Sequence, residues 1–134
     1  MNATQPILTI LVPVKDEEEA IAPFVSRVGK VLEGLPDPAA DSWEILFIDD
    51  GSNDATFAAI LAANANQKRV RAVSLSRNFG KEAALSAGLD YARGDAVIPI
   101  DVDLQDPPEV IADMIKAWRN GSEVVYGVRR NRES

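Results

Sequence analysis

Two spacings of apolar residues alternate along the chain and predict alternating strands and helices. Short runs rich in β-branched and aromatic residues predict five strands, at residues 7–12, 43–48, 70–75, 96–100 and 123–127. Between the strands, apolar residues recur at steps of three and four. This spacing predicts helices from Ile21 to Leu35, around residues 57–61, over residues 81–92 and from Asp106 to Asn120.

Two of these elements carry more specific expectations. In the helix over residues 81–92, we expect Leu85, Leu89 and Ala92 to face inward. Pro99 falls in the fourth strand, and because proline cannot donate to a sheet ladder, it favours an edge strand or the end of a strand.

The order βαβαβαβαβ with short connections predicts an α/β fold. Strands that are continuous apolar runs are buried on both faces, and helical crossovers make them parallel. Right-handed crossovers then give a doubly wound, mostly parallel open sheet with helices on both faces. We expect one domain over residues 1–134. The chain stops directly after a strand-like run, so we also expect it to be part of a longer protein.

Composition narrows the possible chemistry. The 134 residues carry 14 Lys and Arg against 21 Asp and Glu, a net charge of −7, which argues against a nucleic-acid binder. The chain has no Cys and no His, which excludes disulfides, thiolate or His-ligated metals and Ser-His-Asp hydrolysis. No apolar run approaches the roughly 18 residues of a membrane span, and the start lacks a signal-like stretch. We therefore expect a cytoplasmic location.

Acidic residues follow three of the predicted strands. The first strand leads into residues 13–17, the second into residues 49–50 and the fourth into residues 101–106. Since the carboxyl ends of parallel strands lie on one edge of a sheet, these clusters are expected to share the rim where open sheets bind ligands. Carboxylates within about 10 Å of one another repel unless they are compensated, and oxygen ligands suit Mg²⁺ or Mn²⁺.

A metal-bridged diphosphate is the ligand that this rim predicts. Residues 101–105 place Asp, Asp and Gln at alternate positions, which project to the same side of an extended segment. Mg²⁺ takes few protein ligands and completes its shell with water and phosphate oxygens. Arg77, Lys81 and the arginines at residues 129–132 are available to neutralise phosphate charge.

Simpler structural roles stay open at several positions. The turn over residues 49–52 can serve only to join a strand to a helix, and Asp106 fits a helix cap. Glu17, Arg77 and Lys81 remain open between a binding role and a structural or solvated one. Residues whose simplest role is structural are Asp16, Glu18 and Glu19 as charges at a helix N-terminus, Trp43 and Trp118 as packing aromatics, and Arg130 and Arg132 as solvated charges.

Three motifs occur in order, at residues 12–17 (Val-Pro-Val-Lys-Asp-Glu), 48–56 (Ile-Asp-Asp-Gly-Ser-Asn-Asp-Ala-Thr) and 101–109 (Asp-Val-Asp-Leu-Gln-Asp-Pro-Pro-Glu). Together they resemble the family 2 glycosyltransferases of the GT-A fold. The likeness is closest to the polyprenyl-phosphate sugar transferases, the group of dolichyl-phosphate mannose synthase and bactoprenol glucosyltransferase. Residues 76–85 and 126–129 resemble the bactoprenol branch in particular. A lone Asp-x-Asp would be weak evidence, whereas the ordered set is specific and covers nearly the whole chain.

The resemblance implies a role for each matching residue. The implied nucleotide-binding residues are Pro13, Val14, Glu17, Asp49, Asp50, Arg77, Lys81, Asp101 and Val102. The implied metal ligands are Asp101, Asp103 and Gln105, and the implied catalytic residues are Asp101, Asp103 and Arg129. Glu17 would lie near the ribose or base, Asp50 would contact uracil or ribose, and Arg129 would lie near a phosphate. Asp101 has two implied roles, as a metal ligand beside Asp103 and Gln105 or as the residue that holds the ribose or sugar side.

The implied reaction is inverting transfer of a hexose, with UDP-glucose as the expected donor, undecaprenyl phosphate as the expected acceptor and Mg²⁺ or Mn²⁺ as cofactor. The alternatives are a polyprenyl-phosphate mannosyltransferase that uses GDP-mannose and a non-catalytic nucleotide-binding fragment. Members of this branch continue into an acceptor region, amphipathic helices and usually two transmembrane helices. We therefore expect the whole protein at the cytoplasmic face of the inner membrane, with membrane contact through that region and homo-oligomers as one form of assembly.

Two other classes of protein also use acidic residues at the ends of strands: receiver domains hold Mg²⁺ with an acidic cluster, and one class of phosphatase uses an Asp-x-Asp motif. A phosphorelay receiver needs a Lys after its fifth strand and a hydroxyl after its fourth, where this chain has residues 127–129 (Gly-Val-Arg) and 101–103 (Asp-Val-Asp). A haloacid-dehalogenase-type phosphatase carries Asp-x-Asp after its first strand, where this chain has residues 13–16 (Pro-Val-Lys-Asp). Both patterns fit less well than the transferase pattern.

Overall fold

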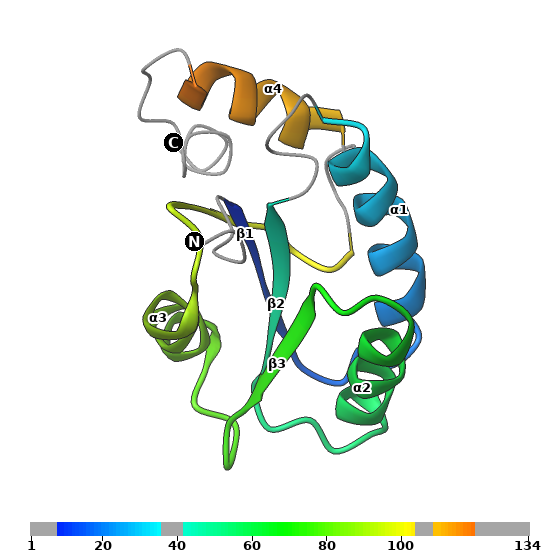
Figure 1. Ribbon diagram of the computed structural model, residues 1–134. Helices are drawn as coiled ribbons and strands as arrows, with labels where there is room; N and C mark the ends of the chain where they lie inside the picture. The colour runs from blue at the N-terminus through cyan, green and yellow to red at the C-terminus, as the bar shows by residue number, and fades with distance from the viewer. Residues whose placement is uncertain (1–7, 36–41, 104–108, 120–134) are drawn as a thin grey trace.

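The computed structural model describes residues 8–35, 42–103 and 109–119, in which a parallel sheet lies between helices (Figure 1). The elements are β1 (Leu8–Val14), α1 (Ile21–Glu33), β2 (Trp43–Asp49), α2 (Thr56–Asn66), β3 (Val70–Ser74), α3 (Lys81–Tyr91), β4 (Ala96–Pro99) and α4 (Glu109–Arg119). Each strand and helix predicted before residue 119 is present. The predicted fifth strand, residues 123–127, and the predicted cap Asp106 lie outside the described residues.

The strands lie in the order β3-β2-β1-β4, and every neighbouring pair is parallel. The predicted doubly wound, parallel α/β fold is therefore confirmed. The chain first adds strands on one side of β1 and then crosses to add β4 on the other side. The carboxyl ends of β1 and β4 consequently form the point where the strand order reverses, which is where open α/β sheets bind ligands.

Prolines mark the ends of the pairing between β1 and β4. The register between the two strands ends at Leu11 opposite Pro99, and Ile100 then donates its amide to the Leu11 carbonyl at 2.9 Å. Pro13 directly follows the predicted first strand, residues 7–12, but β1 continues through it to Val14. The backbone nitrogen of Pro13 is on the β4 side of the strand, as that of Leu11 is. Because Leu11 is the last residue of β1 that pairs with β4, no hydrogen-bond donor is needed at Pro13.

Alternate side chains of the central strands pack on opposite faces of the sheet. On one face, Phe24 of α1 meets Phe47 of β2 edge-on, with ring centroids 5.8 Å apart, among side chains of α2 and α4. On the other face, Leu11 and Leu46 pack with Ala84 of α3. Burial of each large apolar side chain contributes about 2 kcal/mol. Helices therefore cover both faces, as the sequence predicted (Figure 1).

The inward face of α3 differs from the prediction at Leu89, whereas Leu85 and Ala92 pack against the core as expected. Ala84 and Gly88 are the buried residues of this helix, whereas Leu89 is 45% exposed and Leu85 is partly buried. A Cβ atom at Gly88 would lie 2.2 Å from Cδ1 of Leu11, so the helix backbone approaches the sheet closely. The two small residues permit this approach, and Leu89 lies on the exposed side of the helix.

A buried polar network lies at the amino ends of the strands. The carboxylate of Glu44, on β2, accepts from Arg71 Nη1 at 2.6 Å, from the Thr9 hydroxyl at 2.5 Å and from the Arg93 amide at 2.8 Å. The Gly94 amide in turn donates to the Thr9 hydroxyl at 2.9 Å. Both Glu44 and Thr9 are buried. We call these residues the amino-edge network, which joins three strands far from the ligand-binding edge.

Candidate nucleotide and metal site

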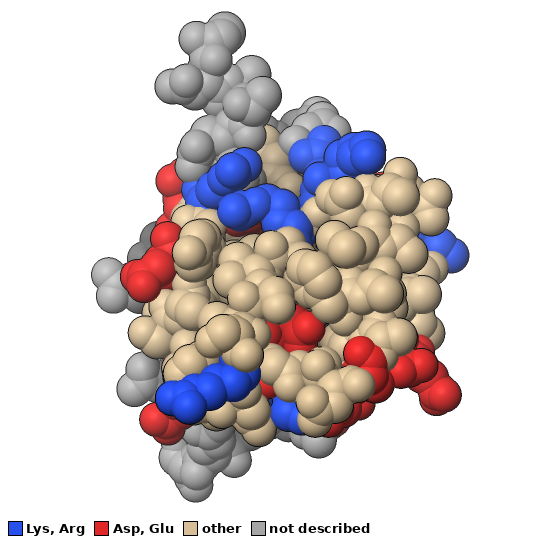
Figure 2. Space-filling view, turned by 90° about the horizontal axis from the view of Figure 1, so that it is seen from below, with Lys and Arg blue, Asp and Glu red and all other residues tan. Residues whose placement is uncertain are grey.

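A cavity of about 270 Å³ opens where β1 and β4 end. Its lining residues are Pro13, Val14, Lys15, Glu17, Asp50, Lys81, Asp101, Val102 and Asp103. They come from the ends of three strands and the first residue of α3. We call this hollow the switch-point cavity, because it lies where the strand order reverses. Figure 2 views the molecule from below, the side on which β1, β2 and β3 end, and shows acidic side chains at the middle of this face and on both sides of it.

The switch-point cavity gathers most of the residues that the sequence singled out. The candidate binding residues that line it are Pro13, Val14, Glu17, Asp50, Lys81, Asp101, Val102 and Asp103. Gln105 and Arg129 lie outside the described residues. Lys15 is a lining residue that the sequence analysis did not select, although its place inside the first acidic motif was a usable signal.

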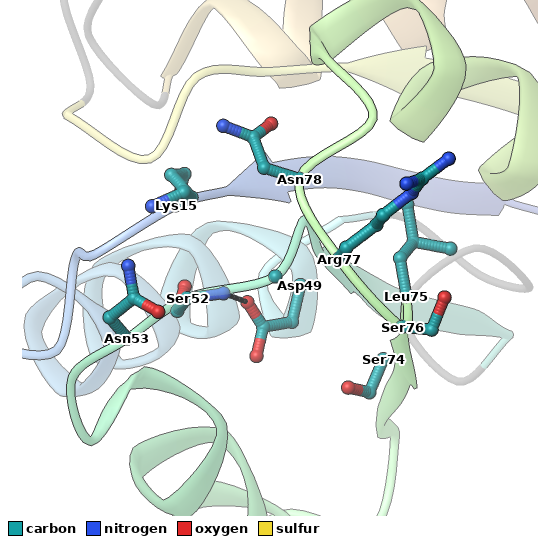
Figure 3. Close-up of a pocket in the computed structure, with 10 residues that line it drawn as sticks. Lys15, Asp49, Ser52, Asn53, Ser74, Leu75, Ser76, Arg77 and Asn78 are labelled. Atoms are coloured by element: carbon teal, nitrogen blue, oxygen red, sulfur yellow. Dashed lines mark hydrogen bonds between the residues drawn. The ribbon is translucent and has the colours of Figure 1, made fainter.

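The remaining two candidates, Asp49 and Arg77, line a second cavity of about 410 Å³ between the ends of β2 and β3 (Figure 3). Lys15 lines both cavities and forms their common wall. The carboxylate of Asp49 accepts the Ser52 amide at 3.0 Å, which is the simple turn-forming role that the sequence left open. The Arg77 guanidinium lies over the Phe79 ring, 4.9 Å from its centroid.

Asp50 fastens the segment that leads into α3. Its two carboxylate oxygens accept the amide of Phe79 at 2.8 Å and the amide of Gly80 at 3.0 Å. Asp50 is only 5% exposed, so these bonds replace solvent for most of the side chain. The left-handed φ of 104° at Gly80 suits glycine and turns the chain into the helix. Asp50 therefore fixes where Lys81, the first residue of α3, stands.

Lys81 forms an ion pair with Asp101, and both residues line the switch-point cavity. Its Nζ atom lies 2.8 Å from Oδ1 of Asp101, at the end of β4. The Lys81 side chain is 55% exposed, whereas that of Asp101 is 24% exposed. One of the expected phosphate-neutralising cations is therefore paired with one of the expected metal-ligating carboxylates.

Reciprocal hydrogen bonds join the loop after β1 to the loop after β2. The Asp16 amide donates to the Ser52 hydroxyl at 2.8 Å, while the Asn53 amide donates to the Asp16 carboxylate at 2.7 Å. Lys15 Nζ is 2.7 Å from the same carboxylate. The Lys15 bond, followed by the Asn53 amide, holds the pKa of Asp16 below its usual value. The bond to Asp16 likewise raises the pKa of Lys15. We call the joined residues 15–20 and 51–56 the loop clasp.

A buried threonine forms the centre of the loop clasp. Thr56 accepts the Glu17 amide at 2.8 Å through its hydroxyl, which also donates to the Asp54 carboxylate. This bond holds the pKa of Asp54 below its usual value. The Glu18 carboxylate accepts the Ala55 amide at 2.9 Å, at the start of α2. The Asp16 and Glu18 carboxylates, expected to favour their own helix N-terminus, thus bond to the neighbouring loop and hold Glu17 at the cavity.

Gly51 is required where the loop clasp meets the segment after β3. Its φ is 72°, in the left-handed region that side chains avoid. A Cβ atom at this position would lie 2.4 Å from both the Arg77 carbonyl carbon and the Asn78 amide nitrogen. The close backbone approach brings together the loops after β1, β2 and β3 around the two cavities.

The switch-point cavity offers two carboxylates to a hard cation, which is fewer ligands than such a cation needs. Asp101 and Asp103 line the cavity together and offer carboxylate oxygens, the ligands that Mg²⁺ and Mn²⁺ prefer. Within residues 8–35, 42–103 and 109–119, no group of three or more Asp, Glu, His or Cys side chains is close enough together to hold a metal ion. A cation at these two carboxylates therefore needs further oxygen ligands, such as phosphate or water.

Comparison with known proteins identifies the family. The family described as Glycosyl transferase family 2 matches residues 9–134. This chain belongs to that family. The match confirms the resemblance on which the sequence analysis rested, and it favours the transferase interpretation over the receiver-domain and phosphatase alternatives. The chain spans only 38 to 40% of the length of the first relatives that it matches.

A relative and two solved structures show how far the likeness extends. The chain is 49% identical to the bactoprenol glucosyl transferase of Shigella phage SfV, over 95% of this chain and 40% of that protein. It resembles the mannosyltransferase PcManGT of Pyrobaculum calidifontis, solved with GDP-Man and Mn²⁺, with a TM-score of 0.70 and 23% identity, over 84% of this chain and 32% of the other. It also resembles glucosyl-3-phosphoglycerate synthase of Mycobacterium tuberculosis, solved with Mn²⁺ and UDP, with a TM-score of 0.63 and 25% identity, over 90% and 43% of the two chains.

Among the helices that the structure describes, none is long and apolar enough to cross a membrane.

Proposed function

We propose that this chain is the nucleotide-sugar-binding domain, residues 1–134, of an inverting glycosyltransferase that moves a hexose from a nucleoside diphosphate to a polyprenyl phosphate. The observation that carries the proposal is the switch-point cavity, in which residues from four separate segments meet at the edge where such sheets bind ligands. Similarity to a bactoprenol glucosyl transferase supports glucose as the sugar and a lipid phosphate as the acceptor.

The chain's own residues have distinct tasks in this proposal. Pro13, Val14 and Glu17 form the wall of the nucleoside pocket, and the loop clasp holds that wall in place. Asp50 positions the start of α3 and keeps a further lone pair on each carboxylate oxygen for the nucleoside. Lys15 stands between the two cavities, where its ammonium can attract a diphosphate that extends from one to the other.

Asp101 and Asp103 would hold a Mg²⁺ or Mn²⁺ ion, with Gln105 as a further expected ligand. When bound, the cation supplies positive charge that stabilises the departing diphosphate. Arg129 is assigned to a phosphate, either of the donor or of the acceptor. Since Asp101 is 24% exposed and Asp103 is exposed, both carboxylates can exchange their present partners for such ligands without unfolding the site.

The reaction proposed is a single in-line displacement. An oxygen of the acceptor phosphate bonds to the anomeric carbon of the sugar while the bond from that carbon to the nucleoside diphosphate breaks, which inverts the configuration. A phosphate acceptor is already anionic, so the site needs no strong general base. This requirement agrees with a chain that contains no histidine.

UDP and GDP donors are both represented among similar structures. Glucosyl-3-phosphoglycerate synthase was solved with UDP, and PcManGT with GDP-Man. The glucosyl relative is much more similar in sequence, which favours UDP-glucose. Because this chain spans about two fifths of that relative, we assign the acceptor region and the contact with the cytoplasmic face of the membrane to the rest of the protein.

The test is transfer of labelled sugar into lipid. The gene should be expressed with its natural downstream sequence in membranes, supplied with undecaprenyl phosphate and with labelled UDP-glucose or GDP-mannose. We expect label in the lipid phase from UDP-glucose only, and loss of that label with EDTA. Label from GDP-mannose alone would establish the mannosyl alternative. Nucleotide binding by residues 1–134 without transfer by the longer protein would support a non-catalytic binding domain.

A further inference from the structure

The ion pair between Lys81 and Asp101 joins the start of α3 to the segment after β4 at the switch-point cavity. The two residues lie on different elements, 20 positions apart, and their side chains meet at 2.8 Å on the wall of the switch-point cavity beside Asp103. The backbone before Lys81 is held by the Asp50 carboxylate. The backbone of the lysine is therefore fixed, while its side chain is 55% exposed.

Helix stability does not explain a lysine at this position. Lys81 is the first residue of α3, and a positive charge there opposes the helix macrodipole. In α1, by contrast, Lys30 stands in the last turn, where a positive charge is favourable. An exposed ion pair adds little stability by itself. The placement of Lys81 is better explained by a function at the cavity.

We propose that Lys81 and a divalent cation are alternative partners of the Asp101 carboxylate, and that Lys81 moves to a diphosphate oxygen when cation and nucleotide bind together. This inference rests on the proposed function for its second half. Its basis is electrostatic: Lys81 Nζ lies on Oδ1 of Asp101, and an ammonium and a divalent cation held by one carboxylate repel each other, so that each weakens the binding of the other. The displaced ammonium, on a flexible four-carbon stem, then pairs with the nearest new anion, which the nucleotide supplies.

The exchange has two consequences of opposite sign. Lys81 competes with a cation that binds alone, so it weakens that binding. It also supplies one ionic contact to the diphosphate, so it strengthens nucleotide binding in the presence of the cation. A lysine with only a structural role would alter both affinities in the same direction or alter neither.

The test is a pair of titrations of residues 1–134 with MnCl₂ alone and with UDP at saturating Mn²⁺, followed by electron paramagnetic resonance and calorimetry. In Lys81→Ala, we expect Mn²⁺ alone to bind about threefold to tenfold more tightly and UDP to bind about fivefold more weakly. Lys81→Arg keeps the charge and should resemble the original chain. Lys68→Ala removes an exposed lysine at the opposite edge of the sheet, at the turn before β3, and is the matched control for net charge.

Thermal melting of each variant separates these effects from loss of folding. Mn²⁺ affinity that is unchanged or weaker in Lys81→Ala overturns the proposal, as does the absence of Mn²⁺ binding to either chain. Tighter Mn²⁺ binding in Lys68→Ala as well would reduce the effect to net charge and overturn it too. If UDP binds to none of the variants, the proposed nucleotide site fails, while the Mn²⁺ titrations still decide whether Lys81 competes for Asp101.

Discussion

Carboxylates at the two ends of the sheet differ in burial and in the partners that they bind. At the amino edge, Glu44 is 3% exposed and its partners come from strands and from the turn before β4. At the carboxyl edge, Asp101 and Asp103 face a cavity, and the cation that pairs with Asp101 is itself more than half exposed. In the first arrangement the carboxylate is buried and both of its oxygens accept hydrogen bonds, whereas in the second the carboxylates can change partners.

We infer from this difference that the amino end of the sheet serves stability and the carboxyl end serves ligand binding. Replacing a buried carboxylate that accepts several hydrogen bonds lowers the stability strongly, because its donors are then left inside the protein without an acceptor. A carboxylate at a cavity costs little to rearrange and is available to a ligand. The loop clasp lies between these extremes, since it has a buried centre at Thr56 and exposed charges around it.

The amino-edge network should give the largest loss of stability. Glu44→Gln places an amide NH₂ where three donors converge, so we expect the free energy of unfolding to fall by about 3 kcal/mol. Urea denaturation monitored by circular dichroism measures this loss. If the amino edge of the sheet serves stability only, the affinity for UDP should change by less than about twofold, that is, by under ~0.5 kcal/mol. A variant that stays stable, or one that folds but loses UDP binding, would contradict the division between the two edges.

The glycine of the loop clasp should give the next largest effect. Gly51→Ala forces a left-handed residue and a Cβ atom 2.4 Å from the backbone of the loop after β3, and we expect a loss of about 2 kcal/mol. Nucleotide affinity should fall as well, because that loop lines a cavity. Gly29→Ala in α1 is the matched control: its Cβ meets nothing within 4 Å, and alanine is the better helix former. Equal losses in the two variants would disprove the close approach at Gly51.

The fold was largely predictable from the sequence, because its strands are apolar runs and its helices have one apolar face. The side chain of Leu89 was placed wrongly because apolar spacing does not reveal that Gly88 lets α3 approach Leu11 so closely. Pro99 was placed well, since its missing donor restricts it wherever it occurs in a strand.

The candidate site was predictable at the level of the sheet edge and less so at the level of contacts. Parallel strands end at one edge of the sheet, and this alone brings residues such as Glu17 and Asp103 to one cavity, independently of their side-chain contacts. The pairing of Lys81 with Asp101 depends on where α3 begins, which Asp50 sets through a long-range bond. The hydrogen bond from the Glu17 amide to the Thr56 hydroxyl joins residues 39 positions apart, and no local sequence pattern predicts it.

A smaller effect is expected at the centre of the loop clasp. Thr56→Val removes the hydroxyl that accepts the Glu17 amide, so we expect a loss of about 1 to 2 kcal/mol in urea denaturation and weaker UDP binding. Thr56→Ser restores the hydroxyl and should recover most of both. If valine is tolerated and serine is not, packing rather than hydrogen bonding holds the two loops together.

The smallest expected effect is the response of the loop clasp to acid. Asp16 and Asp54 have pKa values below the usual 3.8, so they contribute stability above about pH 4 that is lost as the pH falls through their lowered values. Lys15 has a raised pKa, so its contribution is present below pH 10.5 and is lost as the pH rises beyond it. Urea midpoints between pH 7 and pH 2.5 should fall less steeply for Asp16→Asn combined with Asp54→Asn. An unchanged slope would show that these charges do not stabilise the clasp.

The most direct test of the nucleotide and metal site is calorimetric titration of UDP into residues 1–134, with Mn²⁺ present or chelated by EDTA. We expect Mn²⁺-dependent binding that Asp103→Ala weakens by about 100-fold, equivalent to ~3 kcal/mol. Asp90→Ala, an exposed aspartate on α3, should bind as the original chain does. UDP binding that is equally tight with EDTA, or that survives in Asp103→Ala, would contradict a metal-assisted nucleotide site at the switch-point cavity.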